Sequence, residues 1–256
     1  MWLERWPLDS QERCEAQRPE VRLAKQNRPS FFRRVVRRLV LACLLFVVLS
    51  VGAVFALRWV DPPVTTVMLL QPGPIGDIYY EWVDRDAIAW DAGRAVMASE
   101  DQRFAEHHGI DFVSLDRAIE AYADGDGLRG ASTITQQVAK NVFLWQGRSF
   151  ARKALEAYFA VLLELLLTKE RILEIYLNVA EFGPDVFGVE AAADKYFHTS
   201  ARALSLDQAA LLAAVLPNPQ RLLAARPSDY VRERQAQIET EVQLLESRGH
   251  YRGISW

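Results

Sequence analysis

The chain has 256 residues, half of them hydrophobic and a quarter charged, a balance typical of a globular protein with one sizeable core. Its formal net charge is −3, but residues 1–38 carry ten Lys or Arg and five Asp or Glu, so residues 39–256 carry 20 basic and 28 acidic residues. This distribution excludes the basic surface of a nucleic-acid-binding protein, and we expect no nucleic-acid partner.

An uncharged run of 19 residues spans residues 39–57. As a helix it is about 28 Å long, close to the ~30 Å hydrocarbon core of a bilayer. A signal peptide would have a shorter apolar part and a small-residue cleavage site, and a buried core helix is the other alternative. Because four arginines between residues 33 and 38 precede the run, the positive-inside rule predicts a single transmembrane helix with a cytoplasmic N-terminus.

The segments on either side of this span have different characters. Residues 1–38 are predicted to form a basic cytoplasmic tail, largely disordered up to residue 30. Residues 58–84 are predicted to form a linker and membrane-proximal segment, because their prolines favour extended chain. Residues 64–70 and 78–83 are the only strand-like pieces. The two cysteines, Cys14 and Cys43, lie in the tail and the span, so residues 58–256 have no disulfide to offer.

Hydrophobic periodicity predicts helices almost throughout the rest of the chain, and the predicted fold class is mainly α. The helix over residues 151–167 is apolar on nearly every side, which predicts a central buried helix. Glu156 and Glu164 argue against a second membrane span there. The predicted helices are residues 86–99, 112–123, 133–144, 151–167, 169–177, 186–197, 206–216 and 227–248.

The start of the predicted helix over residues 133–144 has the features of an anion site. Thr133 and Gln136 fit a capping box, which indicates that a helix begins here. Free N–H groups, the positive end of the helix dipole, side-chain amides and the Lys140 ammonium would together suit an oxyanion. A well-capped surface helix is an equally good interpretation of this stretch alone.

Two carboxylates lie at apolar positions. Glu156 falls within the predicted buried helix, so it needs a cationic partner. A structural ion pair explains it at least as well as catalysis does. Glu100 ends an apolar helical turn and could serve as a base or an acid; the alternative is an ordinary solvated acid. The candidate cationic partners of Glu156 are Lys140, Arg148, Arg152 and Lys153.

The paired histidines, His107 and His108, do not predict a metal site. Adjacent side chains point apart on a helix, and no third ligand is evident nearby. A structural role for these histidines is therefore the favoured interpretation.

Five motifs occur in order between residues 100 and 197, and together they resemble the motifs of the peptidoglycan glycosyltransferases. The chain is similar to the monofunctional biosynthetic members, because it ends about sixty residues after the last motif and has neither the Ser-x-x-Lys nor the Lys-Thr-Gly of a transpeptidase domain. The motifs are Glu-Asp-x-x-Phe-x-x-His-x-Gly, Gly-x-Ser-Thr-Ile-x-Gln-Gln-x-x-Lys-Asn, Arg-Lys-x-x-Glu, Lys-Glu-x-Ile-Leu-Glu-x-Tyr-Leu-Asn and Gly-x-Glu-Ala-Ala-Ala-x-x-Tyr-Phe.

The resemblance implies a fold, a reaction and a location. Residues 85–256 would form the glycosyltransferase domain, a lysozyme-like helical domain with a smaller membrane-proximal lobe. It would transfer a growing lipid-linked glycan onto the 4-hydroxyl of lipid II with inversion, releasing undecaprenyl pyrophosphate. The catalytic domain would be periplasmic and the span would lie in the cell inner membrane. No cofactor would be required, although a divalent cation (Mg or Mn) accompanying the pyrophosphate and protein partners from cell-wall synthesis remain open.

The resemblance also assigns roles at the matching positions. Glu100 would be the general base on the acceptor hydroxyl, and Asp101 would support Glu100 or its helix end. Glu156 would orient cations or assist a metal. Lys140 and Arg148 would neutralise the donor pyrophosphate, with Arg152 and Lys153 close by. The residues implied to contact the donor are Ser132, Gln136, Gln137, Asn141 and Arg117.

The chain departs from the family pattern at two places, and two other functions are alternatives to this interpretation. Ala131 stands where the family often has a second glycine, and the charged tail is not part of the family pattern. A lysozyme-like lytic glycosidase would share a helical fold and a catalytic glutamate but would not need the cluster of cations. An inactive membrane-anchored scaffold would need neither.

Overall fold

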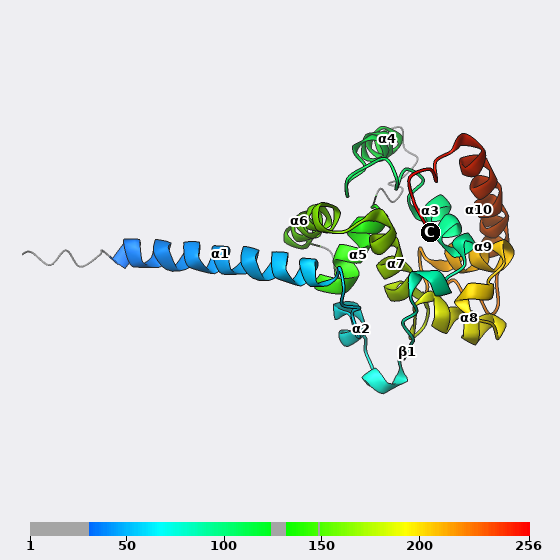
Figure 1. The fold of residues 1–256 in the computed structure, drawn as a ribbon, viewed down its shortest axis with the longest axis horizontal. Helices are drawn as coiled ribbons and strands as arrows, with labels where there is room; N and C mark the ends of the chain where they lie inside the picture. Colours follow the sequence, from blue (N-terminus) through cyan, green and yellow to red (C-terminus); the bar gives the residue numbers. More distant parts are fainter. Residues whose placement is uncertain (1–30, 124–131, 148) are drawn as a thin grey trace, which may run out of the picture. The chain divides into compact units, whose positions relative to one another are not determined.

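The computed structural model describes residues 31–123, 132–147 and 149–256 (Figure 1). The chain divides into two compact units, Met1–Phe46 and Val47–Trp256. Helix α1 (Phe31–Ala56) begins ahead of the span predicted at residue 39 and includes the four arginines in its first turns. Among the described residues, α1 is the one helix long and apolar enough to cross a membrane. The predicted disordered tail up to residue 30 lies outside the described residues.

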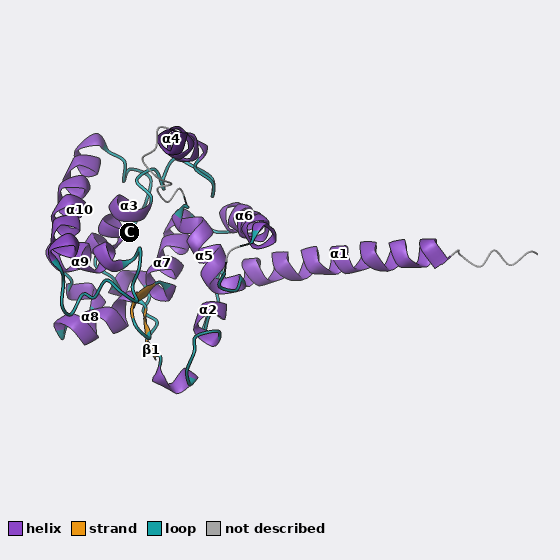
Figure 2. Cartoon of the chain, turned by 180° about the vertical axis from the view of Figure 1, so that it is seen from behind, coloured by secondary structure: helices purple, strands orange, loops and turns teal. Residues whose placement is uncertain are grey.

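The mainly α fold class is confirmed (Figure 2). In the described part of the chain, three short 3₁₀ turns join the longer elements: η1 (Ile75–Asp77), η2 (Arg85–Ala87) and η3 (Ala201–Ala203). The helices after α1 are α2 (Thr66–Leu69), α3 (Trp90–Glu100), α4 (Phe112–Ala123), α5 (Ile134–Phe143), α6 (Phe150–Leu166), α7 (Lys169–Val179), α8 (Val189–Phe197), α9 (Leu206–Val215) and α10 (Asp229–Arg248).

A small three-stranded sheet corrects two of the predictions. Strand β1 (Tyr79–Tyr80) lies inside the predicted strand, but β2 (Glu181–Gly183) and β3 (Val186–Phe187) were not predicted. The strand order is β1-β3-β2, with β1 parallel and β2 antiparallel to β3. The prediction of a helix from residue 186 is wrong at its start, because Gly188 has a φ of 87° and separates β3 from α8.

The prediction of a strand over residues 64–70 is wrong. This segment contains the one-turn helix α2, because the Thr65 side chain caps it by accepting a hydrogen bond from the Met68 N–H at 3.3 Å. The apolar residues Val67 and Met68 are buried, and they pack with Phe187 in a small cluster separate from the main core. A short apolar stretch of this kind fits both a strand and a single helical turn. Here the capping hydrogen bond of Thr65 favours the helical turn.

Helix α7, rather than α6, is the central buried helix, so the prediction for residues 151–167 is wrong. Every residue of α7 from Ile172 to Val179 is buried, and α7 packs against α3, α5, α6 and α8. Helix α6 leaves Val161 42% exposed and Leu165 73% exposed. The Ser50 Oγ and Tyr158 Oη lie 2.6 Å apart, so α6 runs beside the last turns of the apolar helix α1.

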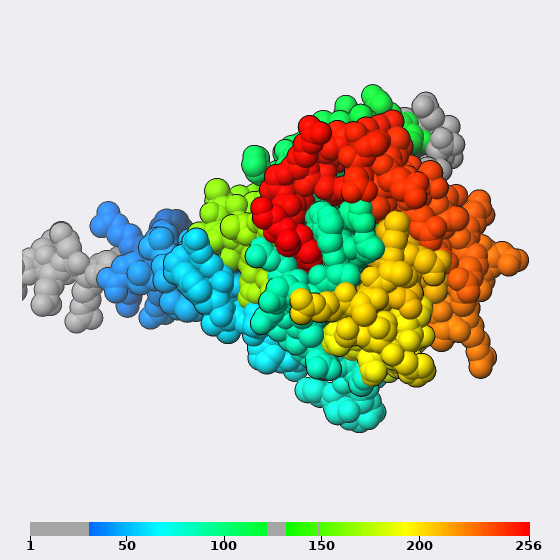
Figure 3. All heavy atoms as spheres, turned by 45° about the vertical axis from the view of Figure 1, so that its right-hand side comes forward, coloured from blue at the N-terminus to red at the C-terminus, as the bar shows by residue number. Residues whose placement is uncertain are grey.

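The C-terminal segment folds back over the start of α3 (Figure 3). The indole of Trp256 stacks on Trp90 with ring centroids 5.4 Å apart, and its N–H donates to the Ile88 carbonyl at 3.0 Å. Helices α9 and α10 pack on the same helix α3. Helix α3, which ends at Glu100, therefore packs against α9, α10 and the C-terminal segment.

Asn178 ties α7 to the chain that leads into α3. This fully buried side chain accepts from the Val83 N–H at 2.9 Å and donates to the Val83 carbonyl at 2.9 Å and to the Glu174 carbonyl at 3.0 Å. It therefore satisfies both backbone polar groups of Val83, which lies outside the helices and strands.

Replacing Asn178 with alanine would leave both Val83 backbone groups unsatisfied. We expect the free energy of unfolding to fall by about 2–4 kcal/mol, and the apparent Tm by roughly 4–16 °C. Thermal unfolding of the detergent-solubilised protein, followed by circular dichroism, measures this change. Asn218→Ala at an exposed position is the matched control, and an unchanged Tm for Asn178→Ala would contradict the expectation.

Candidate active site

The predicted capping box at the start of α5 is confirmed. The Thr133 hydroxyl accepts from the Gln136 N–H at 3.1 Å, and the Gln136 side-chain oxygen accepts from the Thr133 N–H at 3.2 Å. Thr133 also donates to the Gly109 carbonyl at 2.6 Å. Gln136 is buried, so its side chain serves the helix start, and a role in contacting the donor remains a prediction.

Asp101 joins the end of α3 to the start of α5. Its buried carboxylate accepts from the Ile134 N–H at 3.0 Å, one of the free N–H groups of the first turn of α5. The same carboxylate bonds His107 Nε2 at 2.9 Å, and His107 is buried as well. Asp101 therefore fixes the helix that carries Glu100 against the helix that carries Lys140.

Glu100 is held in a defined orientation at the C-terminal end of α3. One carboxylate oxygen accepts from the Gln137 side-chain amide at 2.9 Å, and the other accepts from the Ser99 hydroxyl at 3.2 Å and lies 3.7 Å from the Arg234 guanidinium. Gln137 in turn accepts from the Tyr176 hydroxyl at 3.2 Å. Burial raises the pKa of Tyr176 well above its usual range, so this hydroxyl stays a donor near neutral pH.

A cationic pocket, here called the Lys140 pocket, lies along α5. It has a volume of ≈ 490 Å³ and is lined by α5 and α6 side chains together with the chain after α7. Burial lowers the pKa of Lys140, while the charges of Glu156 and Glu100 oppose that shift. A half-buried ammonium next to a guanidinium suits a ligand of high negative charge. The polar and aromatic lining residues are Gln137, Lys140, Asn141, Trp145, Gln146, Arg152, Tyr176, Glu181 and Phe187.

A smaller pocket of ≈ 190 Å³, here called the Glu100 pocket, opens beside the carboxylate of Glu100. It is also lined by Asp101, Ser132 and Thr133. Gln137 links the two pockets, because it lines the Lys140 pocket and donates to Glu100. This hydrogen bond therefore joins the lining of one pocket to the carboxylate of the other.

Glu156 has the cationic partners that the sequence predicts. Its carboxylate is buried and pairs with the Arg152 guanidinium at 2.8 Å and with the Lys153 ammonium. The Lys153 ammonium also lies 3.2 Å from the Ser132 hydroxyl. Glu156 thus holds two cations of α6 beside Lys140, whose ammonium it also attracts.

One predicted contact lies away from these pockets, and another lies outside the described residues. Arg117 is exposed on α4 and lines neither the Lys140 pocket nor the Glu100 pocket. Arg148 lies outside the described residues, as does Ala131. Asn141 does line the Lys140 pocket.

Sequence reasoning missed two charged residues of the site. Glu181 lines the Lys140 pocket, and burial raises the pKa of its carboxyl. It follows α7 in a short strand without helical periodicity, so no pattern singled it out. Arg234 reaches Glu100 from α10, more than a hundred residues away in sequence and outside every motif.

This helical domain sets a positioned carboxylate beside a cationic pocket, an arrangement chemically suited to removing a proton and stabilising an anion. A family model described as "Transglycosylase" matches residues 73–243. The chain therefore belongs to the transglycosylase family.

Relatives described as "Biosynthetic peptidoglycan transglycosylase" resemble the chain over most of their length. The protein of Xanthomonas campestris pv. campestris (strain B100) is 46% identical over 234 residues, which is 88% of this chain and 95% of the relative. The protein of Pseudomonas aeruginosa (strain PAO1) is 49% identical over 220 residues, 83% of this chain and 94% of the relative. That of Marinomonas sp. (strain MWYL1) is 49% identical over 203 residues, covering 78% and 88%.

Replacing Glu156 with alanine would leave the Arg152 cation buried without its partner, beside Lys140. Because breaking a buried ion pair is costly, we expect the free energy of unfolding to fall by about 3–5 kcal/mol. Urea unfolding of the solubilised protein measures the loss. Glu120→Ala, at an exposed position of α4, removes the same charge as a control. Equal stability of the two variants would show that the Glu156 pairs contribute nothing.

Proposed function

We propose that this protein polymerises the glycan strands of peptidoglycan by transferring a growing lipid-linked chain onto lipid II. The observation that carries the proposal is the juxtaposition of Glu100 with the Lys140 pocket through Gln137. The family and the descriptions of its relatives support the same reaction class. The nascent lipid-linked glycan would be the donor, in the Lys140 pocket, and lipid II the acceptor, at Glu100.

Glu100 acts as the general base in this proposal. Its carboxylate removes the proton of the acceptor 4-hydroxyl while that oxygen bonds the anomeric carbon of the donor. The bond from the anomeric carbon to the pyrophosphate oxygen breaks on the opposite face, so the configuration inverts. Gln137 and Arg234 keep the carboxylate oriented toward the acceptor.

The Lys140 pocket takes up the charge that develops on the leaving undecaprenyl pyrophosphate. The Lys140 ammonium and the Arg152 guanidinium both line it, and such preorganised cations lower the barrier where negative charge develops. Glu156 positions Arg152 and Lys153 rather than the sugar, because its carboxylate is buried between them. Asn141 and Ser132 would contact the substrate through their polar side chains.

The proposed reaction needs no cofactor. In this proposal a divalent cation, magnesium or manganese, would accompany the pyrophosphate rather than reside in the protein. The polymerisation assay below is run with each metal and with a chelator.

We place the protein in the cell inner membrane as a single-pass protein. Helix α1 supplies an apolar span, and its four N-terminal arginines favour a cytoplasmic N-terminus. Residues 58–256 are then periplasmic, where lipid II and other proteins of cell-wall synthesis would meet them.

The direct test presents the protein separately with lipid II and with purified sacculi. The proposal predicts consumption of lipid II and formation of glycan strands, with sacculi left intact. Glu100→Gln should lower the rate by about 10²–10⁴-fold, since the variant lacks the base, while lipid II binding is nearly unchanged. Glu233→Gln, at an exposed position of α10, is the matched control. Release of fragments from sacculi would favour a lytic glycosidase, and inertness toward both substrates would favour a scaffold.

The lowered pKa of Lys140 predicts a pH dependence of anion binding. Below that pKa the ammonium is present and the affinity for inorganic pyrophosphate is full; the affinity falls as the pH rises through it, below the ordinary lysine value of 10.5. Lys140→Arg should move the fall to higher pH, because a guanidinium stays protonated. Calorimetric titration measures both proteins, and comparing them at each pH cancels the titration of pyrophosphate itself. If the affinity of the two proteins for pyrophosphate fell at the same pH, Lys140 would not be the group that binds the anion.

A further inference from the structure

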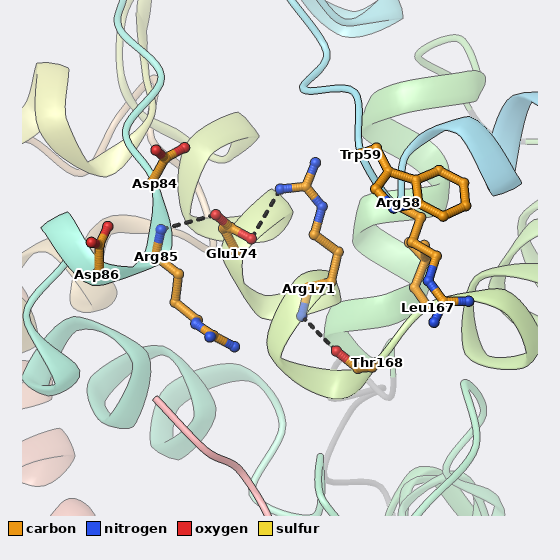
Figure 4. A pocket seen from close by; sticks show the side chains of 9 residues that line it. All are labelled: Arg58, Trp59, Asp84, Arg85, Asp86, Leu167, Thr168, Arg171 and Glu174. Carbon is orange, nitrogen blue, oxygen red and sulfur yellow. Dashed lines mark hydrogen bonds and ion pairs between the residues drawn. The ribbon is translucent and has the colours of Figure 1, made fainter.

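A third pocket, separate from the proposed active site, lies where α1 ends. It has a volume of ≈ 560 Å³ and shares no lining residue with the Lys140 pocket or the Glu100 pocket. Figure 4 shows Arg171 and Glu174 joined in its middle, with residues 84–86 on one side and Arg58 and Trp59 on the other. Leu167 and Thr168, between α6 and α7, complete the lining.

Arg171 fixes this pocket to the outer end of the apolar helix. Its guanidinium donates to the Leu57 carbonyl at 2.8 Å and to the Asp61 carboxylate at 2.6 Å. Leu57 directly follows α1, and the exposed Arg58 and Trp59 come next. Arg and Trp are the residue types that mark the boundary between hydrocarbon and water. The pocket therefore lies at the depth of lipid headgroups.

Apolar surface continues from the pocket toward the bilayer. Leu165 is 73% exposed and Val161 is 42% exposed on α6, shortly before Leu167 in the pocket lining. The contact of Tyr158 with Ser50 shows that α6 runs beside the last turns of α1. Acyl chains can lie on this surface while a headgroup enters the pocket.

The charges of the pocket select the kind of headgroup. Arg171 pairs with Glu174 at 2.9 Å and with Asp61 at 2.6 Å, so its charge is already taken up within the protein. The side chains of Arg58 and Arg85 and of Asp84 and Asp86 form no ion pair with any described residue, although all four line the pocket. Two cations and two carboxylates without ion-pair partners among the described residues suit a ligand that carries both signs; a purely anionic headgroup would face uncompensated carboxylates.

We propose that this pocket binds the phosphoethanolamine headgroup of a phospholipid. The phosphate lies at Arg58, next to the end of α1, and the ammonium donates to Asp84 and Asp86 on the opposite side of the pocket. A primary ammonium has N–H donors for these carboxylates, whereas choline has none. The face of Trp59, which could otherwise attract choline, is covered by the Arg58 guanidinium at 5.6 Å from the ring centroid. A bound lipid would hold the catalytic domain at a fixed depth on the membrane.

Native mass spectrometry of the full-length protein in detergent tests this proposal. Phosphatidylethanolamine, phosphatidylcholine and phosphatidylglycerol with identical acyl chains are added separately, and bound lipid is counted. We expect the wild-type protein to prefer phosphatidylethanolamine by about tenfold over each of the others, as two charge-assisted hydrogen bonds would allow. Free phosphoethanolamine should compete for the site only weakly, because it lacks the acyl chains.

The variant Asp84→Asn/Asp86→Asn sharpens the test. Asp84 makes no side-chain capping bond at η2, and both side chains are exposed, so folding should be unaffected. The variant should lose the preference for phosphatidylethanolamine and bind phosphatidylglycerol better, since only cations remain unpaired. The control Asp77→Asn/Asp116→Asn makes the same charge change at exposed positions outside the pocket. Equal binding of the three lipids by the wild type, or an unchanged preference in the pocket variant, would overturn the proposal.

Discussion

The carboxylate of Asp101 is the contact on which the proposed site depends most. It accepts the Ile134 N–H at the first turn of α5 and bonds His107, so the end of α3 cannot move independently of the start of α5. Glu100 precedes Asp101 directly, and Lys140 lies further along α5. One buried acceptor therefore sets the relation between the proposed base and the proposed anion pocket.

Charge in the site is balanced so that a further anion is still attracted. Glu156 is committed to Arg152 and Lys153, and Glu100 is held by Gln137 beside Arg234. Burial lowers the pKa of Lys140, so its ammonium gains more from a bound anion than a solvated lysine would. A partly buried cation with a shifted pKa is typical of sites that receive a charged leaving group.

Features with a local physical cause were predictable from the sequence. The capping box of Thr133 needs only residues three positions apart, and the need of Glu156 for cations follows from placing a carboxylate on an apolar helix. The motifs also indicated which polar residues belong to the same site. They did not give their separation in space, which depends on the tie made by Asp101 and on the position of α7.

Features set by distant partners were not predictable. An all-apolar helix gives the same pattern whether it faces the protein core or the lipid, so α6 was assigned to the core although Leu165 is 73% exposed. The short strands of the sheet carry too few residues for a period-2 signal. Arg234 and Glu181 reach the site through tertiary packing alone.

The most direct measurement is the rate of lipid II polymerisation by Asp101→Ala, which keeps both Glu100 and Lys140. Loosening the tie between α3 and α5 should lower the rate by about 10²-fold, because small misplacements of reacting groups are that costly. The affinity for inorganic pyrophosphate should be retained, since the Lys140 pocket does not include Asp101. A cooperatively folded Asp101→Ala protein with the wild-type rate would contradict this account.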